Sequence, residues 1–123
     1  MEIPTGTEWM VDATGCDALK LGDLDTLKKV FNAIVHELHL QPVAEPQWKK
    51  FPPPGGVTGM QMLRESHLTC HTFPEHGLAT FNLYCCKPRE AWPWQQKLAQ
   101  LLMAKEVSVR SLLRGAAPAP KPG

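Results

Sequence analysis

The sequence lacks the features that mark a membrane-spanning, secreted or nucleic-acid-binding protein. None of its apolar runs approaches the roughly 20 residues that a membrane-spanning helix needs. Residues 1–6 contain neither a basic nor an apolar stretch, so we expect no signal peptide. The 13 Lys and Arg residues are balanced by 12 Asp and Glu residues, which argues against a partner that is a nucleic acid or an anionic membrane. These absences favour a cytoplasmic protein.

Cysteine is scarce, and its spacing excludes two common motifs. The chain has four cysteines, at positions 16, 70, 85 and 86, and no Cys-x-x-Cys pair, so neither a zinc ribbon nor a thioredoxin motif is indicated. A disulfide between the adjacent Cys85 and Cys86 would be strained. We therefore expect reduced thiols and no structural metal.

The composition is that of one ordinary globular domain. The 123 residues are 43% hydrophobic and 20% charged, which is enough chain to bury a core without disulfides. We predict a single domain over residues 1–114. Residues 115–123 consist of Pro, Gly, Ala and one Lys, and we expect them to be a disordered tail.

The hydrophobic pattern predicts two helices and at least five strands. Apolar residues follow the i, i+3, i+4 rule from Leu24 to Leu38, with Asp23 as the N-cap. A second helix is predicted over residues 93–104, where Pro93 suits the first turn. Strands are predicted over residues 8–14, 57–63, 67–73, 78–86 and 106–113.

This order of elements predicts an α+β fold. We expect a two-layer sandwich, mainly an antiparallel sheet, with the two helices packed on one face. The opposite face of the sheet must then be covered by another copy of the chain or carry a site.

The strand that ends at Cys86 separates the two adjacent thiols. Alternation along a strand puts Cys85 on the face that carries Phe81 and Leu83, and Cys86 on the opposite, polar face. Cys85 is therefore expected in the core. Cys86 is the better candidate for a functional thiol, and the alternative is an inert, solvated side chain.

Residues 65–77 are dense in reactive side chains and allow three interpretations. One is a metal site built from Cys70, His71, Glu75 and His76, although neighbouring residues of a strand point to opposite faces. Another is nucleophilic hydrolysis by Ser66 and a histidine, although no Gly-x-Ser-x-Gly turn is present. The third, which the residue types alone favour, is a half-buried hairpin with hydrogen-bonded histidines.

The same segment resembles the self-cleavage motif of bacterial S-adenosylmethionine decarboxylases. It reads Glu-Ser-His-Leu-Thr-Cys-His-Thr-Phe-Pro-Glu-His-Gly, where the family typically has Glu-Ser-His-Leu/Ile-x-Ile/Val-His-Thr-Trp/Phe-Pro-Glu-x-Gly. Residues 56–59 (Gly-Val-Thr-Gly) and 15–17 (Gly-Cys-Asp) resemble two further family motifs. The spacing from Ser66 to His71 and to Cys86 also matches. On a resemblance that covers residues 8–112, the chain is identified as a member of this family.

The resemblance implies that the chain is a proenzyme that cleaves itself between Glu65 and Ser66. Ser66 would become a pyruvoyl group, the cofactor, at the start of an α chain (residues 66–123), and residues 1–65 would remain as the β chain. His71 corresponds to the base that removes the serine α-proton, and Thr58 stands where the family usually has Ser to hydrogen-bond the cyclic intermediate. Because His71 lies an odd number of residues from Ser66, we expect a bend or bulge at residues 66–67.

In the mature enzyme of this family, the pyruvoyl ketone forms a Schiff base with the amine of the substrate, and carbon dioxide leaves. Cys86 corresponds to the acid that protonates the resulting carbanion. The product of S-adenosylmethionine decarboxylation is the aminopropyl donor of spermidine biosynthesis. The family resemblance further implies a homodimer of processed αβ units.

Departures from the family pattern leave the substrate open. Phe51 and Glu75 correspond to the residues that stack on the adenine and hold the ribose. However, Thr14 stands where the family often has a second aromatic residue, so one stacking partner is either missing or supplied by Trp9, Trp48 or another residue. S-adenosylmethionine is the expected substrate. Arginine or ornithine is the alternative, and an interacting or metal-binding relative that does not cleave itself is a further one.

Overall fold

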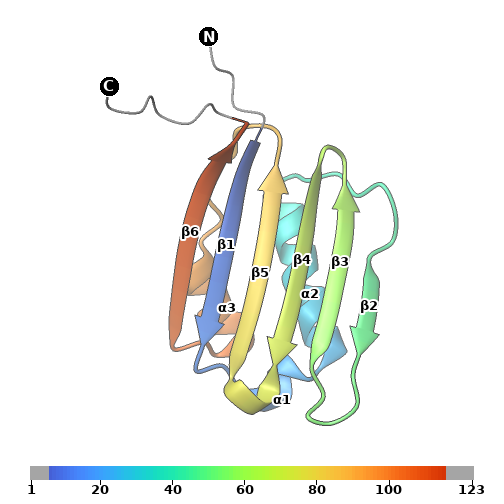
Figure 1. Ribbon diagram of the computed structural model, residues 1–123, viewed down its shortest axis with the longest axis vertical. Helices are drawn as coiled ribbons and strands as arrows, with labels where there is room; N and C mark the ends of the chain where they lie inside the picture. Colours follow the sequence, from blue (N-terminus) through green and yellow to red (C-terminus); the bar gives the residue numbers. More distant parts are fainter. Residues whose placement is uncertain (1–5, 116–123) are drawn as a thin grey trace, which may run out of the picture.

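The described part of the chain, residues 6–115 of a computed structural model, is built around one six-stranded antiparallel sheet. The strands lie in the order β2-β3-β4-β5-β1-β6 (Figure 1). In chain order the elements are β1 (Gly6–Thr14), α1 (Ala18–Leu21), α2 (Leu24–Glu37), β2 (Gln47–Lys50), β3 (Val57–Leu63), β4 (Ser66–Phe73), the 3₁₀ turn η1 (Pro74–His76), β5 (Leu78–Cys85), α3 (Trp94–Leu102) and β6 (Glu106–Arg114).

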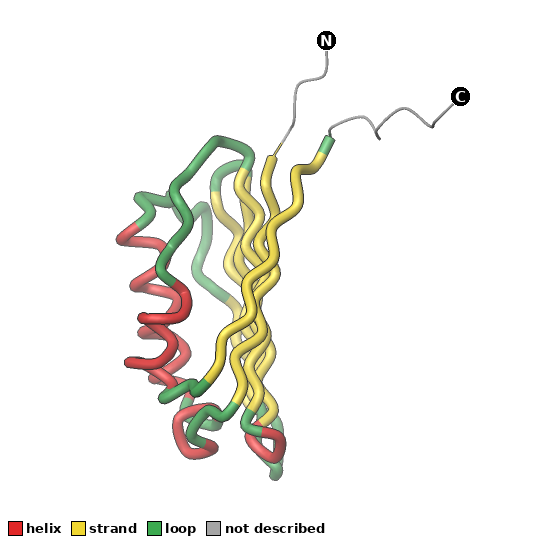
Figure 2. The backbone as a smooth tube through the Cα atoms, turned by 90° about the vertical axis from the view of Figure 1, so that its left-hand side faces the viewer, coloured by secondary structure: helices red, strands yellow, loops and turns green. Residues whose placement is uncertain are grey.

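The helices lie on one side of the sheet, and the other side is open (Figure 2). This arrangement confirms the predicted α+β sandwich with helices on one face. We call the uncovered side the open face of the sheet. Along β5, side chains alternate between buried and half-buried, as a strand with one covered face requires.

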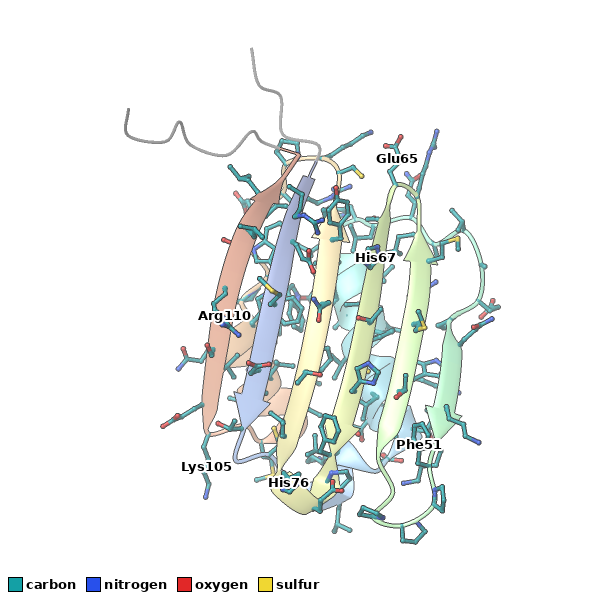
Figure 3. The ribbon with its side chains drawn as sticks, in the orientation of Figure 1. Phe51, Glu65, His67, His76, Lys105 and Arg110 are labelled. Carbon is teal, nitrogen blue, oxygen red and sulfur yellow. The ribbon has the colours of Figure 1, made fainter. Side chains whose placement is uncertain are left out.

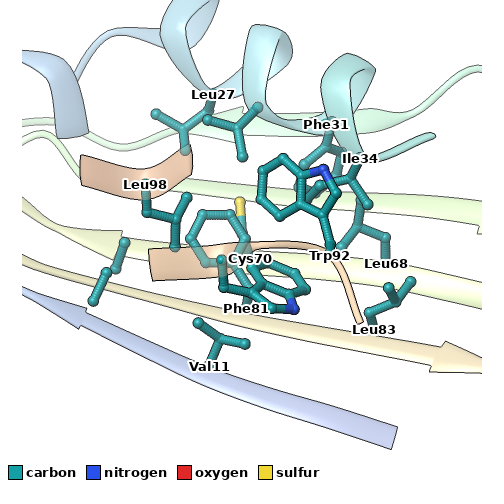
Figure 4. Packing of buried hydrophobic residues seen from close by; sticks show 14 of the residues in the cluster. Val11, Leu27, Phe31, Ile34, Leu68, Cys70, Phe81, Leu83, Trp92 and Leu98 are labelled. Atoms are coloured by element: carbon teal, nitrogen blue, oxygen red, sulfur yellow. The ribbon is translucent and has the colours of Figure 1, made fainter. Parts of the chain in front are cut away.

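Helix α2 begins and ends where the hydrophobic pattern predicts. Its apolar stripe, Leu27, Val30, Phe31 and Ile34, is buried against the sheet (Figure 4). Asp23 occupies the N-cap position, where its carboxylate accepts a 2.7 Å hydrogen bond from the Thr26 hydroxyl.

Two tryptophans lie at the start of helix α3: Trp92 precedes the helix, and Trp94 is its first residue. The rings of Trp92 and Trp94 meet edge to face at 5.0 Å, and both are buried. The Trp92 indole Nε1 donates a 2.9 Å hydrogen bond to Glu37 at the end of α2. The Trp92 ring is thus buried with its one polar atom hydrogen-bonded, so its burial remains favourable.

Two short elements were not predicted, and each has a physical reason. Helix α1 is a single turn capped by the Asp17 carboxylate, which is too short to show a period. Strand β2 is an edge strand whose side chains are mostly exposed, so it has no hydrophobic run. Its Trp48 is the exception, because the ring packs against Phe31, with the ring centroids 4.6 Å apart, and over Gly59.

The suggestion that Trp9 or Trp48 replaces a missing stacking residue is wrong. Trp9 is only 8% exposed and belongs to the hydrophobic core, and the Trp48 ring belongs to the same packed layer beneath the sheet. Neither ring is available to a ligand on the open face.

The expected bulge at residues 66–67 is also wrong. Strand β4 pairs with β5 in unbroken register, from Ser66 opposite Cys85 to Phe73 opposite Leu78. The chain reverses instead in a two-residue turn before β4, where Glu65 has a φ of 58°. A left-handed conformation is unfavourable for a residue with a Cβ, so the backbone strain lies at the residue before the family's cleavage site.

Within residues 6–115, no helix is long and apolar enough to cross a membrane. The predicted tail at residues 115–123 lies outside the described residues, apart from Gly115.

Candidate functional site

Glu65, Ser66 and Cys86 gather at one end of the sheet. Ser66 is the first residue of β4 and lies opposite Cys85, so Cys86 directly follows the partner of Ser66. Glu65 projects from the tip of the β3–β4 hairpin (Figure 3). The Ser66 hydroxyl donates a long hydrogen bond, 3.3 Å, to the Arg64 carbonyl. We call this end of the sheet the hairpin end.

Three pockets border Ser66, and two of them are also lined by Cys86. One, of about 390 Å³, is lined by Glu65, Ser66, Cys86 and three residues whose register places them on the open face, His67, Tyr84 and Arg114. The His67 and Tyr84 rings stack there with centroids 5.5 Å apart. The other pocket, of about 160 Å³, extends toward Leu40 at the end of the α2 region. The serine is therefore reachable from the open face as well as from the helix side.

Thr58 and His71 form a pair on the open face, away from the hairpin end. They lie opposite each other on β3 and β4, and the Thr58 Oγ1 is 2.9 Å from the His71 Nδ1. This hydrogen bond fixes the orientation of the imidazole ring.

Phe51 and Glu75 join the same pair around a pocket of about 410 Å³. The loop that carries Phe51 is fastened by Lys50, whose Nζ donates to the carbonyl oxygens of Gly22, at 2.6 Å, and Gly55, at 2.7 Å. The Phe51 ring remains 44% exposed. We call this group the far-end pocket; Figure 3 shows Phe51 at the end of the sheet opposite Glu65.

The two groups are too far apart to act on one another within one chain. His71 lies five residues beyond Ser66 on a regular strand, a distance of about 16 Å. Their side chains also leave opposite faces of β4, with His71 on the open face. The predicted residues therefore form two separate groups, one at each end of the sheet.

The four cysteines are free, and they differ sharply in environment. Burial raises the pKa of the Cys70 thiol to about 12, and burial also raises the pKa of the Cys85 thiol, as expected for side chains in the core. Cys86 is exposed, as predicted from the alternation along β5.

The metal site considered for Cys70, His71, Glu75 and His76 is not assembled. Cys70 points into the core and His71 points to the open face. Among residues 6–115, no three His, Cys, Asp or Glu side chains are grouped to hold a metal ion.

Comparison with known proteins identifies the family. A family model described as S-adenosylmethionine decarboxylase matches residues 7–115. The chain belongs to this family. The family prediction from the motif at residues 65–77 is thereby confirmed.

Individual relatives match over most of their length. The S-adenosylmethionine decarboxylase proenzyme of Geobacillus kaustophilus is 38% identical over 106 residues, which cover 85% of this chain and 82% of that protein. Proenzyme 2 of Halalkalibacterium halodurans is 35% identical over 114 residues, 92% of this chain and 88% of the relative. The crystal structure of the adenosylmethionine decarboxylase of Aquifex aeolicus has a TM-score of 0.78, with 25% identity and 98% of each chain covered.

Sequence reasoning missed the side chains that surround Ser66 besides the motif itself. Arg64, Lys87 and Arg89 line the smaller pocket at the hairpin end, and Tyr84 lines the larger one. The alternation that put Cys86 on the polar face also put Tyr84 there, so this residue could have been found. The three cations come from two loops, whose positions no periodicity predicts.

Proposed function

We propose that this chain is the proenzyme of a pyruvoyl-dependent S-adenosylmethionine decarboxylase that cleaves itself between Glu65 and Ser66. The observation that carries the proposal is the hairpin end, where the strained turn, the Ser66 hydroxyl and Cys86 come together in a chain of this family. The product, decarboxylated S-adenosylmethionine, would serve as an aminopropyl donor for spermidine synthesis. Processing would yield a β chain of residues 1–65 and an α chain of residues 66–123.

Processing needs only the chain itself and one water molecule. The Ser66 Oγ attacks the Glu65 carbonyl carbon, the C–N bond breaks, and the hydroxyl proton passes to the nitrogen, which leaves an ester. A base then removes the Ser66 α-proton, the Cβ–Oγ bond breaks, and the electron pair departs on the Glu65 carboxylate. Water then hydrolyses the C–N bond of the resulting enamine. The nitrogen leaves as ammonia, and a ketone remains. The strained Glu65 backbone supports cleavage at this peptide, because opening the turn relieves its unfavourable φ.

The residues at the hairpin end fit the pyruvoyl group that this chemistry forms. Ser66 starts a strand and borders three pockets, so its backbone is accessible to a substrate. The group supplies an electrophilic carbon for the substrate amine and an electron sink for the pair released with carbon dioxide. Cys86, exposed and next to the strand partner of Ser66, is the proposed acid that returns a proton to the substrate carbon.

The base and the oxyanion donor are proposed to come from a second copy. Within one chain His71 is about 16 Å from Ser66 along the strand. The partner subunit's His71 would take the Ser66 α-proton, and the partner subunit's Thr58 would donate its hydroxyl to the cyclic intermediate. Each chain thus carries one half of the proposed site at each end of its sheet, and a homodimer brings two unlike halves together.

The open face of the sheet carries large exposed apolar side chains among its polar and charged ones. Met60 is 54% exposed, Met62 65% and Leu112 54%, and register puts Met62 and Leu112 in one row across the sheet. An exposed apolar sheet face favours burial against a partner. A two-fold axis that lies between two stacked sheets, perpendicular to the strands, brings the hairpin end of one copy against the far-end pocket of the other.

The far-end pocket supplies the proposed contacts for the nucleoside of the substrate. The exposed Phe51 ring offers a flat surface for an adenine, and Lys50 holds its loop in place. Glu75 supplies a carboxylate that accepts hydrogen bonds from ribose hydroxyls. These two groups, together with the names of the matched relatives, favour S-adenosylmethionine over arginine or ornithine.

The function is tested by measuring carbon dioxide release from S-adenosylmethionine, arginine and ornithine side by side. The purified protein should consist of two fragments by intact mass spectrometry and should turn over S-adenosylmethionine. Reduction with cyanoborohydride in the presence of substrate should abolish the activity. Turnover of arginine or ornithine with no release from S-adenosylmethionine would refute the proposed substrate while leaving the chemistry intact.

Replacing Cys86 with alanine should leave self-cleavage intact and lower turnover by about a hundredfold or more, because a positioned general acid contributes at least that much. Cleavage is followed by mass spectrometry and turnover by carbon dioxide release. Cys85→Ala is the matched control, since this thiol is buried on the other face and should not affect turnover. Unchanged turnover in Cys86→Ala would remove Cys86 from the role of acid.

We also propose a cytoplasmic location. The four free thiols are compatible with a reducing compartment, where S-adenosylmethionine chemistry would take place.

A further inference from the structure

A small basic pocket lies directly beneath the peptide that is proposed to break. It has a volume of about 160 Å³ and is lined by Arg64, Lys87 and Arg89, together with Glu65 and Ser66. Three basic residues and one acidic residue, Glu65, therefore border the pocket. Figure 3 shows Glu65 at the tip of the β3–β4 hairpin.

Arg89 is the most enclosed of these cations, and it is incompletely paired. Its Nη1 donates a 3.1 Å hydrogen bond to the Leu38 carbonyl just after α2, and its guanidinium lies beside the Cys85 thiol. Its Nε is buried and has no hydrogen-bond partner among residues 6–115. A buried donor without an acceptor is unfavourable, and more so on a charged group. The precursor thus holds a donor that lacks an anion.

We propose that this pocket binds the α-carboxylate that self-cleavage creates on Glu65. The proposal rests on the proposed function, because only cleavage produces this anion. When the Cβ–Oγ bond of Ser66 breaks, the electron pair remains on the former Glu65 carbonyl, which becomes a carboxylate at the end of the β chain. That carboxylate arises at the border of the basic pocket, where a guanidinium can pair with its two oxygens.

The pocket thereby gives the new chain end a fixed place. Once the turn is cut, no peptide bond joins β3 to β4 at this end, where the last strand pair is Leu63 opposite Ser66. An ionic contact at the last residue of the β chain restrains the end that would otherwise fray. It also draws the carboxylate to the helix side of the sheet, so the open-face pocket beside Ser66 stays available for the substrate.

The test compares Arg89→Met in a chain that cleaves itself and in the uncleaved Ser66→Ala chain, at equal protein concentration. If Arg89 binds the new carboxylate, the substitution should lower the melting temperature by at least about 4 °C more in the cleaved protein than in the uncleaved one. It should also speed release of the β chain in mild urea about tenfold. Lys97→Met is the matched control: it breaks the 3.0 Å ion pair with Glu37, and since neither residue lines the basic pocket, it should cost the same in both backgrounds.

Each outcome decides the proposal. Equal destabilisation by Arg89→Met in both backgrounds would mean that the arginine stabilises the fold only through its hydrogen bond to the Leu38 carbonyl. This result would overturn the proposal. A higher KM for substrate without this difference would assign the cations to the substrate carboxylate and also overturn it. Should Arg89→Met fail to fold, the exposed Arg64→Met and Lys87→Met are compared in the same way. Wild-type protein that stays uncleaved would overturn the proposed function as well, whereas cleaved protein without the difference overturns only this inference.

Discussion

Replacing Ser66 with alanine should leave the chain as a single species of 13.7 kDa that releases no carbon dioxide from S-adenosylmethionine. Alanine has no hydroxyl to attack the Glu65 carbonyl, so neither the ester nor the ketone can form. We expect activity to fall by at least about 10⁶-fold, the usual scale of enzymatic rate enhancement. The lost hydrogen bond to the Arg64 carbonyl is long, so folding should be affected by no more than about 1 kcal/mol.

The measurement is intact mass spectrometry after prolonged incubation, with thermal unfolding to check the fold. Ser111→Ala is the matched control, because this serine lies exposed on the edge strand β6 and should cleave and turn over normally. If Ser66→Ala still produced fragments of residues 1–65 and 66–123, the nucleophile would have to be another group. The pyruvoyl proposal would then be wrong.

Much of this fold follows from the sequence because its elements bury one regular face. The α2 stripe and the alternation along β5 each specify a side that must be covered, and the structure covers both with the same core. Strand β2 was not predicted because an edge strand with exposed Lys49 and Lys50 has no regular buried face. Its position is decided by contacts distant in sequence, such as the Trp48 ring over Gly59.

The sequence alone does not predict how the residues of the candidate site are arranged in space. A motif of consecutive residues suggests that Ser66 and His71 meet, and the expected bulge was an attempt to bring them onto one face. The register of β4 instead keeps them apart, because every residue from 66 to 71 is paired with both β3 and β5. The sequence motif suggests which residues take part, but it does not give the distance between Ser66 and His71, on which the proposed sharing of the site between two copies rests.

The second large effect is expected when two inactive chains are combined. Ser66→Ala removes the nucleophile, and His71→Ala removes the base, so neither variant alone should cleave. Co-expressed, they can form a mixed dimer in which the intact Ser66 of one chain faces the intact His71 of the other. Random pairing makes half of the dimers mixed, and one chain in each is competent, so about a quarter of all chains should be cleaved.

The chemical identity of the cleaved chains makes this result decisive. Only the His71→Ala chain retains Ser66, so mass spectrometry should find the His71→Ala substitution in every α fragment. The control pairs Ser66→Ala with a Ser66→Ala,His71→Ala double variant, which has no nucleophile on either chain and should stay uncleaved. Cleavage of His71→Ala by itself would show that the base is not His71. If the co-expressed variants form mixed dimers and both chains remain whole, His71 does not reach across the interface, and the stacking of open faces proposed for the dimer is wrong.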